Sequence, residues 1–249
     1  MDTAKKRQKN DRKIGCSGYH YDEWKGAFYP EDLDKKDWLT YYSERFDTVE
    51  INNSFYQLPD EETMEHWLES TPDDFVFTLK GSRLITHLKK LNEIEAPLKE
   101  FYDHVEVMKE KMGCILWQLH PILQGDEDRL ENFCKALSRD FRNVIEFRHE
   151  SWFDEPYYDI LRRYDVGFCI ISAPEGLPED ALSTTDYAYL RFHGKSEEWY
   201  QYDYNEKELR EWLNRLDDLK VGEWFAYFNN TYKGYAVENA LKMKAMAEG

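Results

Sequence analysis

The sequence predicts an α/β fold, a TIM-type (β/α)8 barrel, on three observations. Eight short apolar runs of strand length recur along the chain. Most of them are separated by segments with apolar residues at three- and four-residue steps, which is the pattern of a helix that covers one face of a sheet. The length of 249 residues also suits one barrel, which typically takes roughly 250 residues.

The expected strands are short and rich in β-branched, aromatic or other apolar residues. In chain order they are Ile14–Gly18, Thr48–Asn52, Phe75–Lys80, Cys114–Leu119, Asn143–Arg148, Gly167–Ser172, Tyr187–Gly194 and Trp224–Asn230.

The expected helices each repeat apolar residues with helical spacing. In chain order they are Asp37–Phe46 (Trp38, Tyr42), Glu61–Glu69 (Met64, Trp67), Pro97–Met112 (Leu98, Phe101, Val105), Asp126–Asp140 (Leu130, Phe133), Pro156–Tyr164, Glu206–Leu219 (Leu209, Trp212, Leu216) and Ala236–Ala247.

This alternation implies parallel strands joined by right-handed crossovers, and eight repeats most simply close into a barrel. A doubly wound open sheet is the competing architecture. It usually carries a glycine-rich nucleotide turn after the first strand, and Gly15-Cys16-Ser17-Gly18 lacks that spacing. The segment after the sixth strand contains Pro174, Gly176 and Pro178 and reads as a loop, so we expect an irregular barrel there.

The domain organisation that we expect is simple. Residues 1–13 are polar and mostly basic, and read as a disordered leader, with contact to nucleic acid as an alternative role. Residues 14–249 show no break in composition and read as one barrel domain. No apolar segment is long enough to span a bilayer, no signal peptide is evident, and the four cysteines have no metal or redox spacing. A cytoplasmic location without membrane contact is the default expectation.

The net charge of −17 bears on the choice of partner. Affinity for nucleic acid depends on neutralising phosphates, so this charge argues against broad binding to DNA or RNA. A local basic site is still compatible with it, and an acidic surface also serves solubility.

Polar side chains recur near the carboxyl ends of six expected strands, where active sites of such barrels lie. We therefore take as candidate site residues Glu50, Asn52, Lys80, Gln118, Glu146, Arg148, His149, Trp152, Arg191, His193, Tyr227 and Asn229. Ion pairs such as Lys80 with Glu50 could instead only join the layers of the interior. Because buried charge is costly unless it is paired or useful, the whole set is harder to explain by packing alone.

Three of these residues are candidates for catalysis. Glu50 and Glu146 could form an acid–base pair, and His193 could transfer a proton because an ordinary histidine titrates near neutrality. The glutamates could also bind a divalent metal together with His149 and His193. No His-x-His or His-Glu-x-x-His spacing supports a metal, which is therefore possible but not favoured, and no other cofactor is indicated.

The remaining candidates suit a ligand rather than a reaction. Lys80, Arg148 and Arg191 favour a small anionic ligand, since arginine captures phosphate or carboxylate with two hydrogen bonds. The loop Gly81–Lys90 is a local basic patch, and aromatic residues such as Trp199 and Tyr200 follow the seventh strand. Aromatic side chains can stack on bases, although they more often pack on the barrel rim. These loops support a non-catalytic nucleic-acid or nucleotide-binding protein as the alternative function.

A set of motifs in chain order gives the sequence a family resemblance. They are Gly15-Cys16-Ser17-Gly18-Tyr19, Trp24-Lys25-Gly26-Ala27-Phe28-Tyr29-Pro30, Val49-Glu50-Ile51-Asn52, Ile85-Thr86-His87, Glu146-Phe147-Arg148-His149, Arg191-Phe192-His193-Gly194 and Tyr227-Phe228-Asn229-Asn230. With these motifs the chain resembles the family called domain of unknown function 72, the YecE-like proteins, over nearly its whole length.

The resemblance implies a TIM-type barrel with a pocket lined by those motifs, and it implies no activity. Members of the family often carry an aspartate near the end of the sixth strand, where this chain has Ser172-Ala173-Pro174. Hydrolysis of a phosphate-containing or sugar-like ligand is the expected reaction by analogy with other barrels alone.

Overall fold

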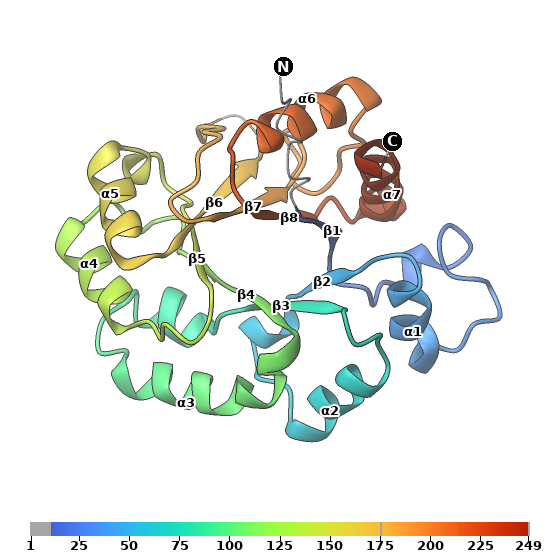
Figure 1. Cartoon of the computed structure of the whole chain (residues 1–249), viewed down its shortest axis with the longest axis horizontal. Coiled ribbons are helices and arrows are strands. Elements are labelled where there is room, and N and C mark those ends of the chain that lie inside the picture. Colours follow the sequence, from blue (N-terminus) through green and yellow to red (C-terminus); the bar gives the residue numbers. More distant parts are fainter. Residues whose placement is uncertain (1–10, 175, 249) are drawn as a thin grey trace, which may run out of the picture.

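The computed structural model describes residues 11–174 and 176–248. Eight parallel strands close into a barrel in chain order, because β8 pairs with β1 (Figure 1). The strands are β1 Asp11–Ser17, β2 Thr48–Ile51, β3 Val76–Lys80, β4 Met112–Gln118, β5 Asn143–Glu146, β6 Gly167–Ser172, β7 Tyr187–Phe192 and β8 Glu223–Phe228. The closing pair confirms the predicted TIM-type (β/α)8 barrel and excludes the open sheet.

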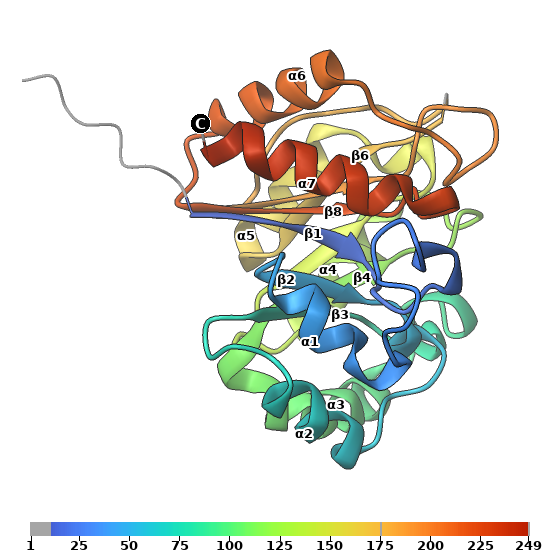
Figure 2. The same ribbon diagram turned by 90° about the vertical axis from the view of Figure 1, so that its right-hand side faces the viewer.

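Helices pack outside the barrel and cover the strands (Figure 2). They are α1 Trp38–Ser43, α2 Glu61–Glu69, α3 Glu95–Val105, α4 Glu127–Ala136, α5 Glu155–Tyr164, α6 Glu206–Asp217 and α7 Tyr235–Glu248. Several begin as their sequences suggest. The side chain of Asp60, for example, accepts a hydrogen bond from the backbone of Thr63 at the start of α2, and Asn205 with Glu208 forms a capping box on α6.

The connection between β6 and β7 contains no helix among its described residues, so the irregularity expected after the sixth strand is present. Thr184 ties this connection to the barrel. Its hydroxyl donates to the carbonyl of Val166 at 2.6 Å and accepts from the backbone N–H of Phe168 at 2.9 Å. The segment therefore stays on the barrel wall without the hydrogen bonds of a helix.

Several element boundaries differ from the sequence expectation by a few residues, and two of the differences have a clear cause. The first strand begins at Asp11 rather than Ile14, because its backbone pairs with β8 from Glu223 onward; the rest of the expected leader, residues 1–10, lies outside the described residues. The helix expected to run to Met112 ends at Val105 and continues as a 3-10 turn. There Lys111 donates to the carbonyls of Leu68, Thr71 and Pro72, each at 2.9 Å, and so fixes the entry into β4.

The barrel interior is layered by polarity. Its lower part is apolar, with Leu116, Val144 and Phe225 among the buried residues. Above them the hydroxyl of Tyr227 lies 2.6 Å from the Thr48 hydroxyl and 2.9 Å from the Thr78 hydroxyl. The fully buried charged side chains Glu50, Glu146 and Arg191 lie towards the carboxyl ends of the strands. This end of the barrel is called the mouth below.

Candidate active site

The centre of the mouth is Arg191 on β7, whose side chain is only 1% exposed. Its Nη1 donates to Oε2 of Glu146 at 2.6 Å, and its Nη2 donates to Oε1 of Glu50 at 2.7 Å. Glu50 comes from β2 and Glu146 from β5, so one guanidinium links three strands across the barrel. The two expected carboxylates and the arginine are thus brought together as the sequence suggested.

Glu50 is fully occupied by donors. Besides Arg191, its Oε1 accepts from the hydroxyl of Ser17 at 2.6 Å, and its Oε2 accepts from the hydroxyl of Tyr189 at 2.5 Å. All four side chains are buried. Both oxygens of this carboxyl therefore accept hydrogen bonds, which is the usual condition for keeping a buried polar group.

Glu146 is held in the same way by four donors. Oε1 accepts from Gln118 at 2.9 Å, from Arg148 at 3.1 Å and from Nε2 of His193 at 3.2 Å, while Oε2 accepts from Arg191. Burial alone raises the pKa of this carboxyl, but the charges of Arg191, His193 and Arg148 and the His193 hydrogen bond outweigh it, so the pKa lies well below the ordinary range. Glu146 is therefore ionised at neutral pH.

His193 is buried beneath Trp199, with ring centroids 5.3 Å apart. Its Nδ1 lies 3.1 Å from the amide nitrogen of Asn229, which can only donate, so Nδ1 accepts and Nε2 carries the proton that faces Glu146. Burial lowers the pKa of His193 to about 4, with Glu146 opposing the shift and Arg191 adding to it. The ring is therefore neutral at pH 7, and both of its nitrogens are engaged by the protein.

Lys80 and Arg148 are the cations whose unused donors are not fully buried, whereas the Nε of Arg191 also lacks a partner but is fully buried. Among the described residues, Nζ of Lys80 makes no hydrogen bond or ion pair, and it lies 4.3 Å from the ring centroid of Phe55. Burial and the nearby charge of Arg191 lower the pKa of Lys80 to about 8, against the opposing pull of Glu146 and Glu50. Arg148 donates a hydrogen bond from Nη1 to Glu146, and its guanidinium carbon lies 4.3 Å from the ring centroid of Trp199.

The charge balance at the mouth is therefore positive. Among the residues described above, Lys80, Arg148 and Arg191 bring three cations against the two carboxylates of Glu50 and Glu146. This local excess lies within a chain whose net charge is −17. An anion entering the mouth would meet unused donors on two side chains and no carboxylate with an unused oxygen.

Two histidines beside the mouth are absent from the set expected from the sequence. The ring of His87 lies 4.8 Å from Phe55 and 4.9 Å from His120. Burial lowers the pKa of His87 to about 4, with His120, Lys80, Arg83 and Arg148 adding to the effect. The π-helical turn Leu84–Leu88 directs this side chain, and that rare turn has no sequence period that would reveal it.

Four expected site residues lie away from this network. Tyr227 belongs to the hydroxyl layer below it. Trp152 is buried outside the barrel, where its indole N–H donates to the carbonyl of Leu123 at 2.6 Å. His149 caps the 3-10 turn after β5 by accepting from the backbone of Ser151. Asn52 lines a separate cavity of about 250 Å³ beside the loop that follows β1.

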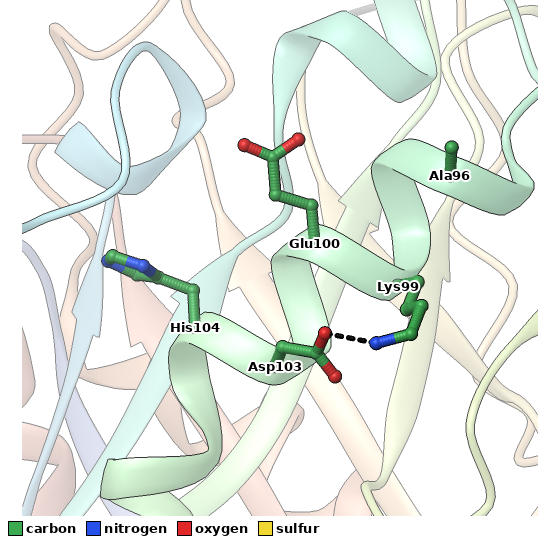
Figure 3. Close-up of a pocket in the computed structure, with 5 residues that line it drawn as sticks. All are labelled: Ala96, Lys99, Glu100, Asp103 and His104. Atoms are coloured by element: carbon green, nitrogen blue, oxygen red, sulfur yellow. Dashed lines mark hydrogen bonds and ion pairs between the residues drawn. The ribbon is translucent and has the colours of Figure 1, made fainter.

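No cluster of three or more His, Cys, Asp or Glu side chains suited to a metal occurs in residues 11–174 and 176–248. A further hollow lies on the outer face of α3 and contains none of the mouth residues (Figure 3). Lys99 and Asp103, which line it, pair with each other. Within the same described ranges, no helix is both long and apolar enough to cross a membrane.

Comparison with known proteins places these features in a family context. The family described as "Protein of unknown function DUF72" matches residues 13–249. The chain is 27% identical to "UPF0759 protein YunF" of Bacillus subtilis over 92% of both chains, and 31% identical to "UPF0759 protein YecE" of Escherichia coli over 46% of this chain and 43% of that protein. A crystal structure of a DUF72 protein from Thermotoga maritima matches with a TM-score of 0.89 and 32% identity, over 96% of this chain and all of that one.

Proposed function

Since this chain belongs to the DUF72 family of proteins of unknown function, we propose a function from the geometry of the barrel mouth. The mouth binds a small anionic ligand that carries a phosphate or carboxylate group, and Lys80 and Arg148 hold that group. One observation supports this most strongly. These two cations keep donors unused within the described residues, whereas both carboxylates beside them are already saturated.

Each neighbour has a role in this proposal. Glu146 binds Nη1 of Arg148 and fixes the plane of the guanidinium, which Trp199 covers on one face. The other edge of the guanidinium is left to meet two oxygens of an anion, the geometry for which arginine is suited. Arg191 adds positive charge from below, but both of its terminal nitrogens are already bonded to Glu50 and Glu146.

Hydrolysis of a glycoside, one of the reactions expected by analogy, fits Glu146 poorly as the general acid. Glycoside cleavage by a carboxylate pair needs one carboxyl that is protonated near neutral pH, whereas the pKa of Glu146 lies well below the ordinary range. Assays with phosphoesters and glycosides test this reaction directly. We expect turnover, where found, to survive Glu146→Gln better than Lys80→Met, because Lys80 contacts the ligand in this proposal.

The second candidate function is binding of a nucleotide or single-stranded nucleic acid. Large side chains are exposed on loops that follow several strands at the mouth, including Tyr56 (71% exposed), Leu88 (62%) and Ile122 (64%). Of these, the aromatic ring of Tyr56 could stack on a base whose phosphate reaches Lys89 and Lys90. This candidate predicts affinity that falls steeply with salt and is lost in the Lys89→Glu, Lys90→Glu double variant. Undetectable or salt-independent binding would end it.

A thermal-shift series tests the main proposal. A ligand that binds only the folded state raises the apparent stability, so phosphate, pyrophosphate and small dicarboxylates should each be titrated against the protein. We expect a saturable rise in Tm with at least one of these anions, lost in Arg148→Met. The matched control is Arg163→Met, which removes an exposed guanidinium paired with Glu131. Equal shifts in all three proteins would overturn the proposal.

A further inference from the structure

We infer that Lys80 is an amine nucleophile that forms a reversible imine with a ligand carrying both a carbonyl and an anionic group. The inference rests on the proposed anion binding and adds the substrate class and the reacting atom. The position of the amine, its surroundings and a nearby proton acceptor support it.

The position of Lys80 is that of a reacting group rather than of a structural cation. It is the last residue of β3, at the carboxyl end of the barrel where ligands bind in this fold. Its Nζ has no hydrogen bond or ion pair among the described residues, although Glu50 and Glu146 lie in the same mouth. Both acids are instead bound by Arg191, which leaves the amine available to a ligand.

The surroundings of the amine favour its neutral form. Phe55 covers it on one side, and Arg191 and Arg148 repel its positive charge. With a pKa of about 8, roughly a tenth of the side chain is free amine at pH 7. Desolvation beside an apolar surface and a second cation is a known way of activating a lysine as a nucleophile.

The reaction balances without an oxidant or reductant. The lone pair of Nζ attacks the carbonyl carbon, the C=O π electrons move to oxygen, and a proton passes from nitrogen to that oxygen to give a carbinolamine. Loss of the hydroxyl group as water, with one further proton supplied, leaves the protonated imine. Hydrolysis of the imine reverses each step and releases the lysine.

His87 can accept the proton that leaves the nitrogen, and the proton needed for the loss of water comes from solvent. Its Nδ1 lies 2.9 Å from the hydroxyl of Thr86, which in turn donates to the carbonyl of Ser82 at 3.4 Å, so Nδ1 carries a proton and Nε2 keeps its lone pair. No described residue engages Nε2. His87 and Lys80 both contact Phe55, and the charge of Lys80 contributes to the lowered pKa of His87, so the two groups face the same space.

Reductive trapping tests the inference. The protein is incubated at pH 7 with pyruvate, oxaloacetate or dihydroxyacetone phosphate in the presence of borohydride, and the modified lysine is identified by peptide mass spectrometry. We expect a saturable adduct on Lys80, formed at least roughly tenfold faster than on Lys99, an exposed lysine of α3, since the lowered pKa raises the amine fraction. Lys80→Arg should lose this adduct and keep the one on Lys99.

Three further results separate the inference from the proposed function. An adduct on Lys80 that forms no faster than the one on Lys99, or no adduct there at all, overturns the inference even if anions still raise the Tm. An adduct on Lys80 that phosphate does not suppress supports the amine chemistry and counts against anion binding at Arg148. His87→Gln should slow trapping severalfold with Lys80 intact, and an unchanged rate would remove His87 from the mechanism.

Discussion

Nη1 of Arg191 lies 2.6 Å from Oε2 of Glu146, and neither side chain is more than 1% exposed. The same guanidinium reaches Glu50 at 2.7 Å through Nη2. Charges this deep are stable only when each has a partner, so the arginine and the two acids form a unit. In our proposal this unit lies below the anion that Lys80 and Arg148 hold.

Removing the shared partner should therefore be costly. We expect Arg191→Met to lower the free energy of unfolding by about 3–5 kcal/mol, because it leaves two buried carboxylates without their cation. Urea denaturation at pH 7 measures the change. Arg162→Met, which breaks exposed pairs with Glu155 and Asp159, should cost less than about 1 kcal/mol. A similar small loss for Arg191→Met would show that the network contributes nothing.

The orientation of Arg148 by Glu146 should appear in ligand affinity. The Glu146→Gln substitution removes the negative charge of the carboxylate. The new amide N–H can also face the N–H donors of Arg148 or His193, which it cannot bond. We expect the apparent Kd for the best-binding anion to rise about tenfold, the equivalent of losing about one charge-assisted hydrogen bond. Isothermal titration calorimetry gives this value. Glu223→Gln, which changes an acid at the start of β8, should leave the Kd unchanged.

Stability should fall in mild acid because of His193. Its pKa is lowered to about 4 in the folded protein, against an ordinary value near 6.5. Between these two pH values the histidine is protonated in the unfolded chain but neutral in the folded protein. The stabilisation is complete above pH 6.5 and is lost as the pH falls towards 4. From pH 7 to pH 5 we expect a loss of roughly 2 kcal/mol from this group.

The matched variants make this pH effect specific. His193→Gln should have a shallower fall in unfolding free energy between pH 7 and pH 5, measured by urea denaturation at each pH. His66→Gln, which replaces an exposed histidine of α2, should retain the steep fall. Identical slopes in the two variants would contradict the assignment of the effect to His193.

The hydroxyl layer below the mouth gives a prediction about the barrel itself. Tyr227→Phe removes the partner of the Thr48 and Thr78 hydroxyls without changing the ring. We expect a loss of about 1–3 kcal/mol in unfolding free energy, since buried hydroxyls are left unsatisfied. Tyr232→Phe, at a partly exposed tyrosine, is the control and should be near neutral. A neutral Tyr227→Phe would mean that the threonines find other partners.

The sequence predicted the barrel well because the alternation of strands and helices is a local pattern. It also predicted much of the mouth, since side chains two residues apart on one strand share a face. Glu146 with Arg148 and Arg191 with His193 are such pairs, and in the structure Arg148, Arg191 and His193 all bond to Glu146. The family resemblance led to the same positions.

What the sequence could not predict depends on contacts between distant segments. The sequence around Arg191 does not indicate that both terminal nitrogens bond to Glu50 and Glu146. These ion pairs leave the amine of Lys80 without a partner among the described residues. Trp152 follows a strand as a site residue would, yet it packs outside the barrel on Phe147, with interplanar angle 15°. His87 belongs to one of the motifs of the family resemblance but was not among the candidate site residues, and a π-helical turn carries it to Phe55.

The central claim is that Lys80 and Arg148 together hold an anion at the mouth. Diffraction from crystals soaked in tungstate, an anomalously scattering analogue of phosphate, tests it most directly. We predict an anomalous peak within hydrogen-bonding distance of Nζ of Lys80 and the guanidinium of Arg148, and no such peak in Arg148→Met crystals. Tungstate bound only elsewhere on the protein, or a mouth peak that persists in the variant, would contradict the account.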